Sequence, residues 1–338
     1  MSIEQARKMW NYLPELPIQV SPYFRKPFNV LNIIKWMFAS WFPVSDRLVV
    51  LLLASLSLIF FTPDIATTKD LSFGWISQIY IRNVILLTLV AGGLYLYFYV
   101  WRKQGDELRF DEKPAVKSHS PFTFNSQLWD NIFWSIASGV TIWTAFEVLL
   151  MWSMANGYVA VLDAKTDWPW MVLIIFLIPI WESLYFFAIH KLIHWPPLYK
   201  TVHHLHHRNT NVIPWSGFSM HPVEHLLFMG SVLIHFIVPI SPLILLFHLQ
   251  YYALTAASTH TGYRGIKLGK RFVFPIGTFH HQLHHRFYEC NYGSLEIPMD
   301  KWTGHFHDGT DESQQAFSQR QRQKAKALKE KARAKTNG

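Results

Sequence analysis

Long apolar stretches alternate with polar segments along the first 190 residues of the chain. A helix needs about 20 apolar residues to cross the hydrocarbon core of a bilayer. Four stretches approach that length, and they are Leu48–Thr62, Val84–Trp101, Ile132–Ser153 and Trp170–Ile189. The first is short and lies between Pro43 and Pro63, so we expect it to tilt little or to extend to Arg47, whose long side chain can reach the head groups. The pattern predicts an all-α, polytopic membrane protein with about four transmembrane helices.

A fifth apolar region, Leu226–Leu249, is long enough to cross the membrane once, but Pro239 and Pro242 interrupt it. Histidine-rich segments lie on both sides of this region in the sequence. If those segments form one site, they must share one face of the membrane. We therefore expect a re-entrant helical hairpin here, because irregular backbone at membrane depth is tolerated when protein covers it.

Basic residues alternate between the predicted spans, and this alternation predicts their orientation. Lys and Arg together number six in Met1–Arg47, two in Pro63–Asn83, five in Arg102–Asn131 and one in Ala155–Pro169. Loops that are rich in these residues stay on the cytoplasmic side. We therefore expect a multi-pass protein of a bacterial inner membrane or the endoplasmic reticulum. Both termini, the Arg102–Asn131 loop and everything after the fourth span should be cytoplasmic.

Composition agrees with a membrane protein and excludes other classes. Of the 338 residues, 50% are hydrophobic and 16% are charged, whereas about a quarter are charged in a typical soluble domain. The formal net charge is +9, but Arg320–Lys335 alone holds eight basic residues and one acidic residue, a net of +7. The rest of the chain therefore offers no basic face for nucleic acid. We expect the tail to form a polar helix or a disordered extension and to bind an anionic membrane surface.

Eighteen histidines require an explanation, and three clusters carry the strongest signal. They are His190–His194 with HxxxH spacing, and His203–His207 and His281–His285 with HxxHH spacing. On a helix, residues three and four positions apart lie on one face, so each cluster can direct two or three imidazoles at one point. Without a metal, clustered imidazoles would repel one another when charged or lose hydrogen bonds when buried. The clusters predict a metal centre with imidazole ligands, which suit iron, copper, zinc and nickel. The single cysteine, Cys290, excludes an internal disulfide and a CxxC metal site.

Several other polar residues are weaker candidates for the same site. His221 and His225 are four positions apart, and His260 lies between a serine-threonine pair and Thr261. Each of these histidines is either a ligand or a hydrogen-bonding residue, and Glu224 is available to hold a ligand in place.

The remaining histidines and the carboxylates of the spans have weaker claims. We expect His204 and His280 to lie behind the ligands, and we expect structural roles for His119, His235, His248, His305 and His307. Glu147 and Glu182 lie inside spans, where an ionisable group is a functional candidate. We favour pairing with a neighbouring helix for both.

The order and spacing of these residues resemble those of the fatty acid hydroxylase and sterol desaturase superfamily of integral-membrane, histidine-box, di-metal oxygenases. The resemblance covers His190–Gly309 and includes the three clusters, the His-Pro-x-Glu segment at His221, Asn291-Tyr292-Gly293, and Asp300 ahead of Gly304. This chain has Thr303-Gly304-His305 where relatives commonly have Phe-Gly-Thr, which affects packing more than chemistry. On this basis we divide the chain into an N-terminal amphipathic, cytoplasmic segment (1–47), a transmembrane bundle (48–189), a di-metal catalytic domain (190–309) and a basic cytoplasmic tail (310–338).

The resemblance implies a cytoplasmic, histidine-rich helical cap that binds two iron ions and uses O2 as co-substrate, with zinc as the alternative metal in isolated protein. Its catalytic metal ligands would be His190, His194, His203, His206, His207, His281, His284 and His285, and His221, His225 and His260 would complete the metal site. Electrons would come from a separate b-type cytochrome, or from a ferredoxin with its reductase. The chain lacks the His-Pro-Gly-Gly of a fused haem donor.

The implied function is hydroxylation of a C–H bond in a lipid, such as a fatty acyl chain, a sterol or a related lipid, that slides from the bilayer into a slot between the spans. Desaturation is the alternative within the family, and the sequence does not decide between the two. A zinc-dependent membrane lipid hydrolase would need an open metal position and a general base such as Glu224. A metal transporter would need polar residues through the spans, whereas the histidines here follow the fourth span.

Overall fold

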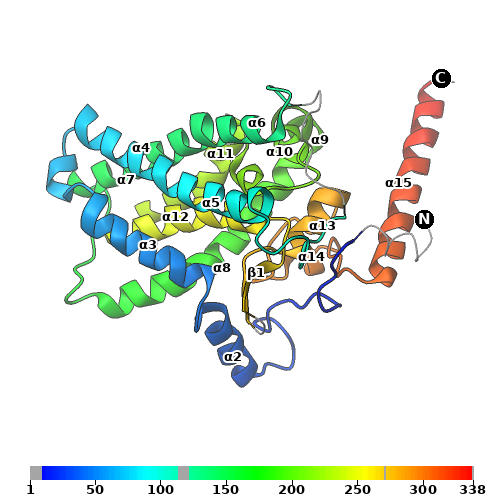
Figure 1. The fold of residues 1–338 in the computed structure, drawn as a ribbon, viewed down its shortest axis with the longest axis horizontal. Coiled ribbons are helices and arrows are strands. Elements are labelled where there is room, and N and C mark those ends of the chain that lie inside the picture. Colours follow the sequence, from blue (N-terminus) through cyan, green and yellow to red (C-terminus); the bar gives the residue numbers. More distant parts are fainter. Residues whose placement is uncertain (1–9, 113–121, 270–271, 337–338) are drawn as a thin grey trace.

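The computed structural model describes residues 10–112, 122–269 and 272–336, and helices dominate it (Figure 1). The helices are α2 (Val30–Trp41), α3 (Asp46–Phe61), α4 (Phe73–Leu87), α5 (Gly93–Tyr95), α6 (Gln127–Trp134), α7 (Thr141–Ala155), α8 (Trp168–Ile193), α9 (Pro196–Leu198), α10 (His204–His207), α11 (Pro222–Met229), α12 (Pro242–Thr259), α13 (Phe279–Phe287), α14 (Met299–Trp302) and α15 (Asp311–Thr336). Strands β1 (Gly265–Leu268) and β2 (Phe272–Pro275) form a small antiparallel hairpin. The predicted all-α fold class is confirmed.

Within the described residues, three helices are long and apolar enough to cross a bilayer. They are Phe73–Val100, which joins α4 to α5 through π-helical turns, Gln127–Ala155, which joins α6 to α7 in the same way, and α8. A fourth span results if α2 and α3, which bend by 51° at their junction, count as one. Large apolar side chains such as Ile59 and Leu89 are about two-thirds exposed on these helices, at 68% and 67%, as expected for contact with lipid rather than water. The protein is therefore a multi-pass membrane protein.

The second span begins earlier than the sequence predicts. It starts at Phe73 rather than Val84, because Arg82 is buried inside the bundle instead of lying in a loop. The Arg82 guanidinium donates to both carboxylate oxygens of Glu147 at 2.5 Å, and Asn83 donates to Thr144 at 3.2 Å. This buried ion pair satisfies charges that hydropathy alone assigns to solvent. The pairing of Glu147 with a neighbouring helix is thus observed.

The predicted hairpin appears as α11 with a following 3-10 turn and then α12. Glu224, near the start of α11, contacts His203, and His260, at the end of α12, contacts His285. Both ends of the hairpin therefore return to the same group of histidines. The turn between them pairs Ile240 with Val161, in the loop after α7, so the hairpin extends through the bundle to its other end.

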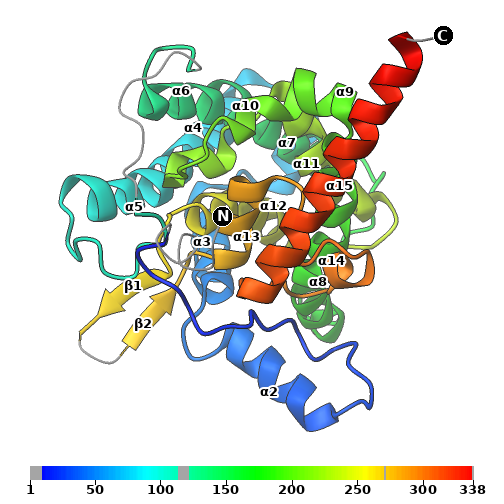
Figure 2. The same cartoon turned by 90° about the vertical axis from the view of Figure 1, so that its right-hand side faces the viewer.

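Helix α12 is the centre of the hydrophobic core. It packs against α3, α4, α7 and α8, and most of its side chains are buried. Its Ser241 caps the first turn by accepting from the Ile244 amide at 3.4 Å. Figure 1 shows α13, α14 and α15 gathered at one end of the long helices, and Figure 2 shows the β-hairpin and α2 beside them. Helix α15 leaves the body of the protein, and all of its side chains from Arg322 to Glu330 are exposed.

Candidate metal centre

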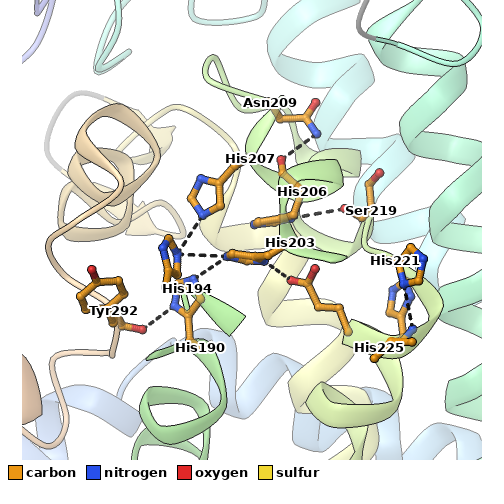
Figure 3. A network of polar contacts seen from close by, with 12 residues as sticks. His190, His194, His203, His206, His207, Asn209, Ser219, His221, His225 and Tyr292 are labelled. Atoms are coloured by element: carbon orange, nitrogen blue, oxygen red, sulfur yellow. Dashed lines mark hydrogen bonds and ion pairs between the residues drawn. The ribbon is translucent and has the colours of Figure 1, made fainter. Parts of the chain in front are cut away.

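Five histidines converge on one point from three segments of the chain, and Figure 3 shows four of them, His190, His194, His203 and His207. His190 and His194 come from the end of α8, His203 and His207 from the segment around α10, and His284 from α13, and this set is called the five-histidine group. One ring nitrogen from each lies within 4.8 Å of the others. The closest Nε2–Nε2 separations within the group are 3.0 to 3.2 Å. The imidazole nitrogens thus surround a common centre.

A second set lies directly beside the first. The four-histidine group consists of His206 from α10, His260 at the end of α12, and His281 and His285 from α13. Its ligand nitrogens also lie within 4.8 Å of one another, and the closest Nε2–Nε2 separations are again 3.0 to 3.2 Å. The ring centres of His206 and His207 are 5.6 Å apart, so the two groups are neighbours.

The HxxHH spacing explains how one short helix serves both groups. On α13, His281 and His285 are four positions apart and share a face, so both join the four-histidine group. His284 lies on an adjoining face and joins the five-histidine group. The segment around α10 divides in the opposite sense, because His203 and His207 enter the five-histidine group and His206 enters the other.

Backbone carbonyls orient two ligands of the five-histidine group. The Nδ1–H of His190 donates to the carbonyl of Tyr292, and that of His284 donates to the carbonyl of Cys290, both at 2.6 Å. Asp300 holds this loop in place, since its carboxylate accepts from the amides of Tyr292 and Gly293 at 2.7 and 2.8 Å. Sequence reasoning noted Asp300 only as part of a motif and missed these carbonyls, because backbone partners leave no signal in residue types.

Three further ligands have acceptors behind them. The Nδ1–H of His203 donates to Glu224 Oε1 at 2.7 Å, in the role expected for that carboxylate. In the four-histidine group, His260 donates to the Ala256 carbonyl at 2.8 Å and His206 is 3.3 Å from the Ser219 carbonyl. These bonds fix which ring nitrogen carries the proton.

The protonation of the rings tests whether a metal fits. Burial lowers the pKa of His206 to about 4 and moves the pKa of His203 and His284 well below the usual value for imidazole. A neutral imidazole carries one N–H, and in these rings that N–H is Nδ1, so lone pairs on Nε2 face one another at about 3 Å. Such lone pairs repel unless a cation lies between them. The residues therefore fit a metal ion in each group.

The separations also bear on the metal. With metal–nitrogen bonds of about 2.1 Å, two donors at a right angle lie about 3.0 Å apart, and two tetrahedral donors lie about 3.4 Å apart. The shortest separations of 3.0 to 3.2 Å lie between these two values, and all the donor nitrogens of each group lie within 4.8 Å of one another. The larger group brings together five donors, one more than a tetrahedral zinc site uses. All-imidazole donor sets also suit iron.

Two of the candidate ligands lie outside both groups. His221 caps α11, where its Nδ1 accepts from the Val223 amide at 3.2 Å. His225 is buried, with Nδ1 2.9 Å from Ser138 Oγ and Nε2 3.2 Å from the Phe218 carbonyl. Both histidines thus contact protein groups outside the two groups, whereas His260 lies in the four-histidine group.

His119 falls outside the described residues. The other remaining histidines lie outside both groups. His280 is buried with its Nε2 3.8 Å from Asp300, as expected for a residue behind the ligands, but His204 is exposed. His235 and His248 contact each other at 2.8 Å. His305 contacts Lys191 at 2.8 Å and His307 contacts Gln314 at 3.1 Å.

A cavity of about 300 Å³ adjoins both groups. Its walls include His206, His260 and His281 of the four-histidine group, and His190 and His203 of the other. Apolar side chains such as Phe186, Ile189, Met220 and Phe228 form much of the rest. The cavity runs along α8 and α12, between the metal groups and the interior of the bundle.

Comparison with known proteins agrees with this geometry. Residues 174–305, which carry both groups, match the family described as fatty acid hydroxylase. This match and the relatives below support the fatty acid hydroxylase and sterol desaturase superfamily as the group that the chain is similar to. No solved structure matches it.

Three curated relatives show what this chain is similar to. The chain is 28% identical to the Delta(7)-sterol 5(6)-desaturase ERG3B of Gibberella zeae over 40% of its own length and 42% of that protein. It is 26% identical to the Delta(7)-sterol-C5(6)-desaturase of Nicotiana tabacum over 71% of its own length and 84% of that protein. It is 27% identical to methylsterol monooxygenase 1 of Danio rerio over 41% of its own length and 48% of that protein.

Proposed function

We propose that this protein is a membrane-bound, non-haem di-iron oxygenase that uses O2 and external electrons to hydroxylate a C–H bond of a lipid. The observation that carries the proposal is the pair of adjacent imidazole groups, of five and four nitrogens, that open onto one largely apolar cavity. Two iron ions in these positions would supply the redox chemistry that O2 activation requires. The cavity adjoins the spans, so a lipid can enter from the bilayer without exposing its apolar length to water.

The residues of the chain position the ligands and exclude water. The carbonyls of Tyr292 and Cys290 and the carboxylate of Glu224 hold the imidazole rings of His190, His284 and His203 in fixed orientations, with Nε2 directed inward. The rings are almost completely buried, so competing solvent is kept away from the centre. A site held in this way needs little rearrangement when it binds O2 and substrate.

Desaturation is the second candidate outcome. The names of the relatives include both sterol desaturases and a methylsterol monooxygenase, and both removal of a second hydrogen and transfer of oxygen begin with the same C–H bond. A zinc hydrolase is disfavoured, because the donor counts of both groups exceed those of a three-ligand hydrolytic site.

Orientation and partners complete the proposal. The counts of Lys and Arg support a cap and both termini in the cytoplasm, where a b-type cytochrome or a ferredoxin with its reductase would supply electrons. The basic helix α15 would bind an anionic membrane surface. Cysteines introduced at Gly157 and Gly338 should be labelled from opposite sides, and labelling from one side would contradict this topology.

The test of function is a lipid profile combined with isotope labelling. Cells that express the active protein should accumulate an oxidised lipid that is absent with His190→Ala. With ¹⁸O2, hydroxylation incorporates one labelled oxygen, and desaturation gives an unlabelled double bond that forms only with O2 and reductant. Turnover by a zinc-only protein without O2 would contradict the proposal.

A further inference from the structure

The two carbonyls that orient His190 and His284 belong to the residues on either side of Asn291. Cys290 precedes Asn291 and Tyr292 follows it, so the conformation of Asn291 determines where both carbonyls point. Asn291 is completely buried and has a φ of 55°, a left-handed backbone conformation that asparagine adopts more readily than most residues. One residue therefore forms the turn from which two metal ligands receive their orientation.

The hydrogen bonds of Asn291 join this turn to two other parts of the cap. Its Nδ2 donates to the carbonyls of His280, on α13, and His307 at 3.1 and 3.0 Å. Its Oδ1 accepts from the His307 amide at 2.7 Å, and its backbone amide donates to the His305 carbonyl at 3.0 Å. The turn is thus held from two sides, and one of them is the segment that leads into α15.

Helix α15 contacts that segment through the side chain of His307. The Nε2–H of His307 donates to Gln314 Oε1 at 3.1 Å, and its Nδ1 accepts from the Gly309 amide at 3.1 Å. The His307 ring stacks on Phe287 with ring centres 5.4 Å apart, and Phe317 packs against both rings at 5.3 and 6.1 Å. Phe317 is 7% exposed, so the first turns of α15 are part of the cap rather than of the exposed tail.

The four-histidine group has acceptors in other parts of the chain. The acceptor of the His260 ring is the carbonyl of Ala256 on α12, and the ring of His206 lies beside the carbonyl of Ser219. Neither carbonyl belongs to the loop around Asn291. A change at Asn291 or in the first turns of α15 should therefore affect one group and spare the other.

We infer that Asn291 and His307 are positioning residues for the five-histidine group, and that the first turns of α15 hold them in place. Gln314 and Phe317 are the residues of α15 that do so. This inference rests on the proposed di-iron site and gives part of α15 a role in it. The side chains from Arg322 to Glu330 are exposed, so the proposed membrane contact would involve that later part of the helix.

Iron(II) affinity of full-length variants tests the inference without turnover. Two parent variants are loaded under nitrogen and titrated against a chelator. In His260→Ala the retained ion lies in the five-histidine group. The second parent combines His190→Ala with His284→Ala, so both rings that the loop orients are absent and the tightly bound ion lies in the four-histidine group.

Asn291→Gly tests the turn itself. Glycine keeps the left-handed backbone but removes the three side-chain hydrogen bonds. In the His260→Ala parent it should weaken iron(II) binding about tenfold, as expected when support behind a metal ligand is lost, and in the second parent it should leave the affinity unchanged. Asn125→Gly is the matched control, because Asn125 also has a positive φ, of 52°, but is exposed.

Phe317→Ala tests the contribution of α15. In the His260→Ala parent it should weaken iron(II) binding about threefold or more, because the His307 ring loses an aromatic neighbour. Phe317→Leu keeps an apolar side chain at this position and should lose less. Leu328→Ala is the control, because Leu328 lies on the same helix and is 59% exposed.

The two parents separate positioning from a general loss of structure. Thermal unfolding of the metal-free proteins shows which variants are folded. Equal losses in both parents, or unchanged affinity of folded Asn291→Gly and Phe317→Ala in the His260→Ala parent, would overturn the inference and leave the metal centre in place. A His260→Ala parent that binds no iron(II) would contradict the five-histidine metal position itself, and the inference with it.

Discussion

The two histidine groups have the same donor chemistry but different numbers of ligands and different surroundings. The five-histidine group has two rings held by backbone carbonyls and a third held by Glu224. The four-histidine group has fewer donors, and three of its four rings line the cavity, compared with two of five in the other group. We therefore expect the five-histidine group to hold its metal with few open positions. The four-histidine group should leave positions open for O2 beside the substrate.

Removal of a ligand from the four-histidine group should have the largest effect. In His260→Ala only three imidazoles remain at the metal that faces the cavity, and the neighbouring rings lose their common partner. We expect lipid oxidation to fall to the background of metal-free protein, measured with O2 and reductant in excess. Substantial activity in this variant would contradict the expectation that O2 binds at the four-histidine group.

The loss of activity caused by removing a ligand from the five-histidine group should be partly reversed by excess metal. His194 is the one half-buried member of that group, and His194→Ala leaves four donors. We expect metal affinity to fall roughly tenfold to hundredfold, by analogy with losses around other metal sites, and excess iron(II) to restore part of the activity. If His194→Ala is inactive at every metal concentration while excess metal restores activity to His260→Ala, the two groups have the opposite roles to those expected.

Loss of the carboxylate behind His203 should have a smaller effect. Glu224→Ala removes the acceptor of the His203 Nδ1–H, and we expect metal affinity to fall about tenfold or more. Glu224→Gln keeps an acceptor and should retain more affinity. The measurement is a competitive metal titration with a chelator, in which equal behaviour of the two variants would show that Glu224 does not orient the ligand.

His221 should matter least, because it caps α11 instead of joining either group. His221→Ala should lower the stability of the fold by about 1 kcal/mol, the usual cost of losing an N-cap, and should leave metal content unchanged. Thermal unfolding and metal analysis of the same sample check both parts. Loss of a metal ion from His221→Ala would show that His221 is a metal ligand.

The sequence predicts much of this site because helical spacing is a local property. HxxxH and HxxHH place rings on one face, and the structure brings all eight histidines of the three clusters together. The sequence alone could not predict that His206 would lie in a different histidine group from His203 and His207. That division depends on how α10 meets α12 and α13. Likewise, only tertiary packing shows that His260 joins a group while His225 bonds to Ser138.

The fold shows the same limit. Apolar length identified the spans, but the start at Phe73 depends on the buried contact of Arg82 with Glu147, which are 65 residues apart. Hydropathy assigns each residue by itself, whereas a buried pair satisfies both charges at once. The bend of 51° between α2 and α3, by contrast, falls where local signals lie, since the break contains Pro43 and the Ser45 N-cap of α3.

The metal content of paired variants tests whether the two histidine groups are two separate metal positions. Full-length protein is loaded with iron(II) without oxygen, freed of loosely bound metal and analysed by mass spectrometry together with His260→Ala and His284→Ala. We expect two ions per chain in the unaltered protein and one in His260→Ala, retained by the five-histidine group. His284→Ala should bind its ion in that group more weakly and keep the ion of the four-histidine group. A single ion per chain in active protein, or two tightly held ions in His260→Ala, would contradict two separate metal positions.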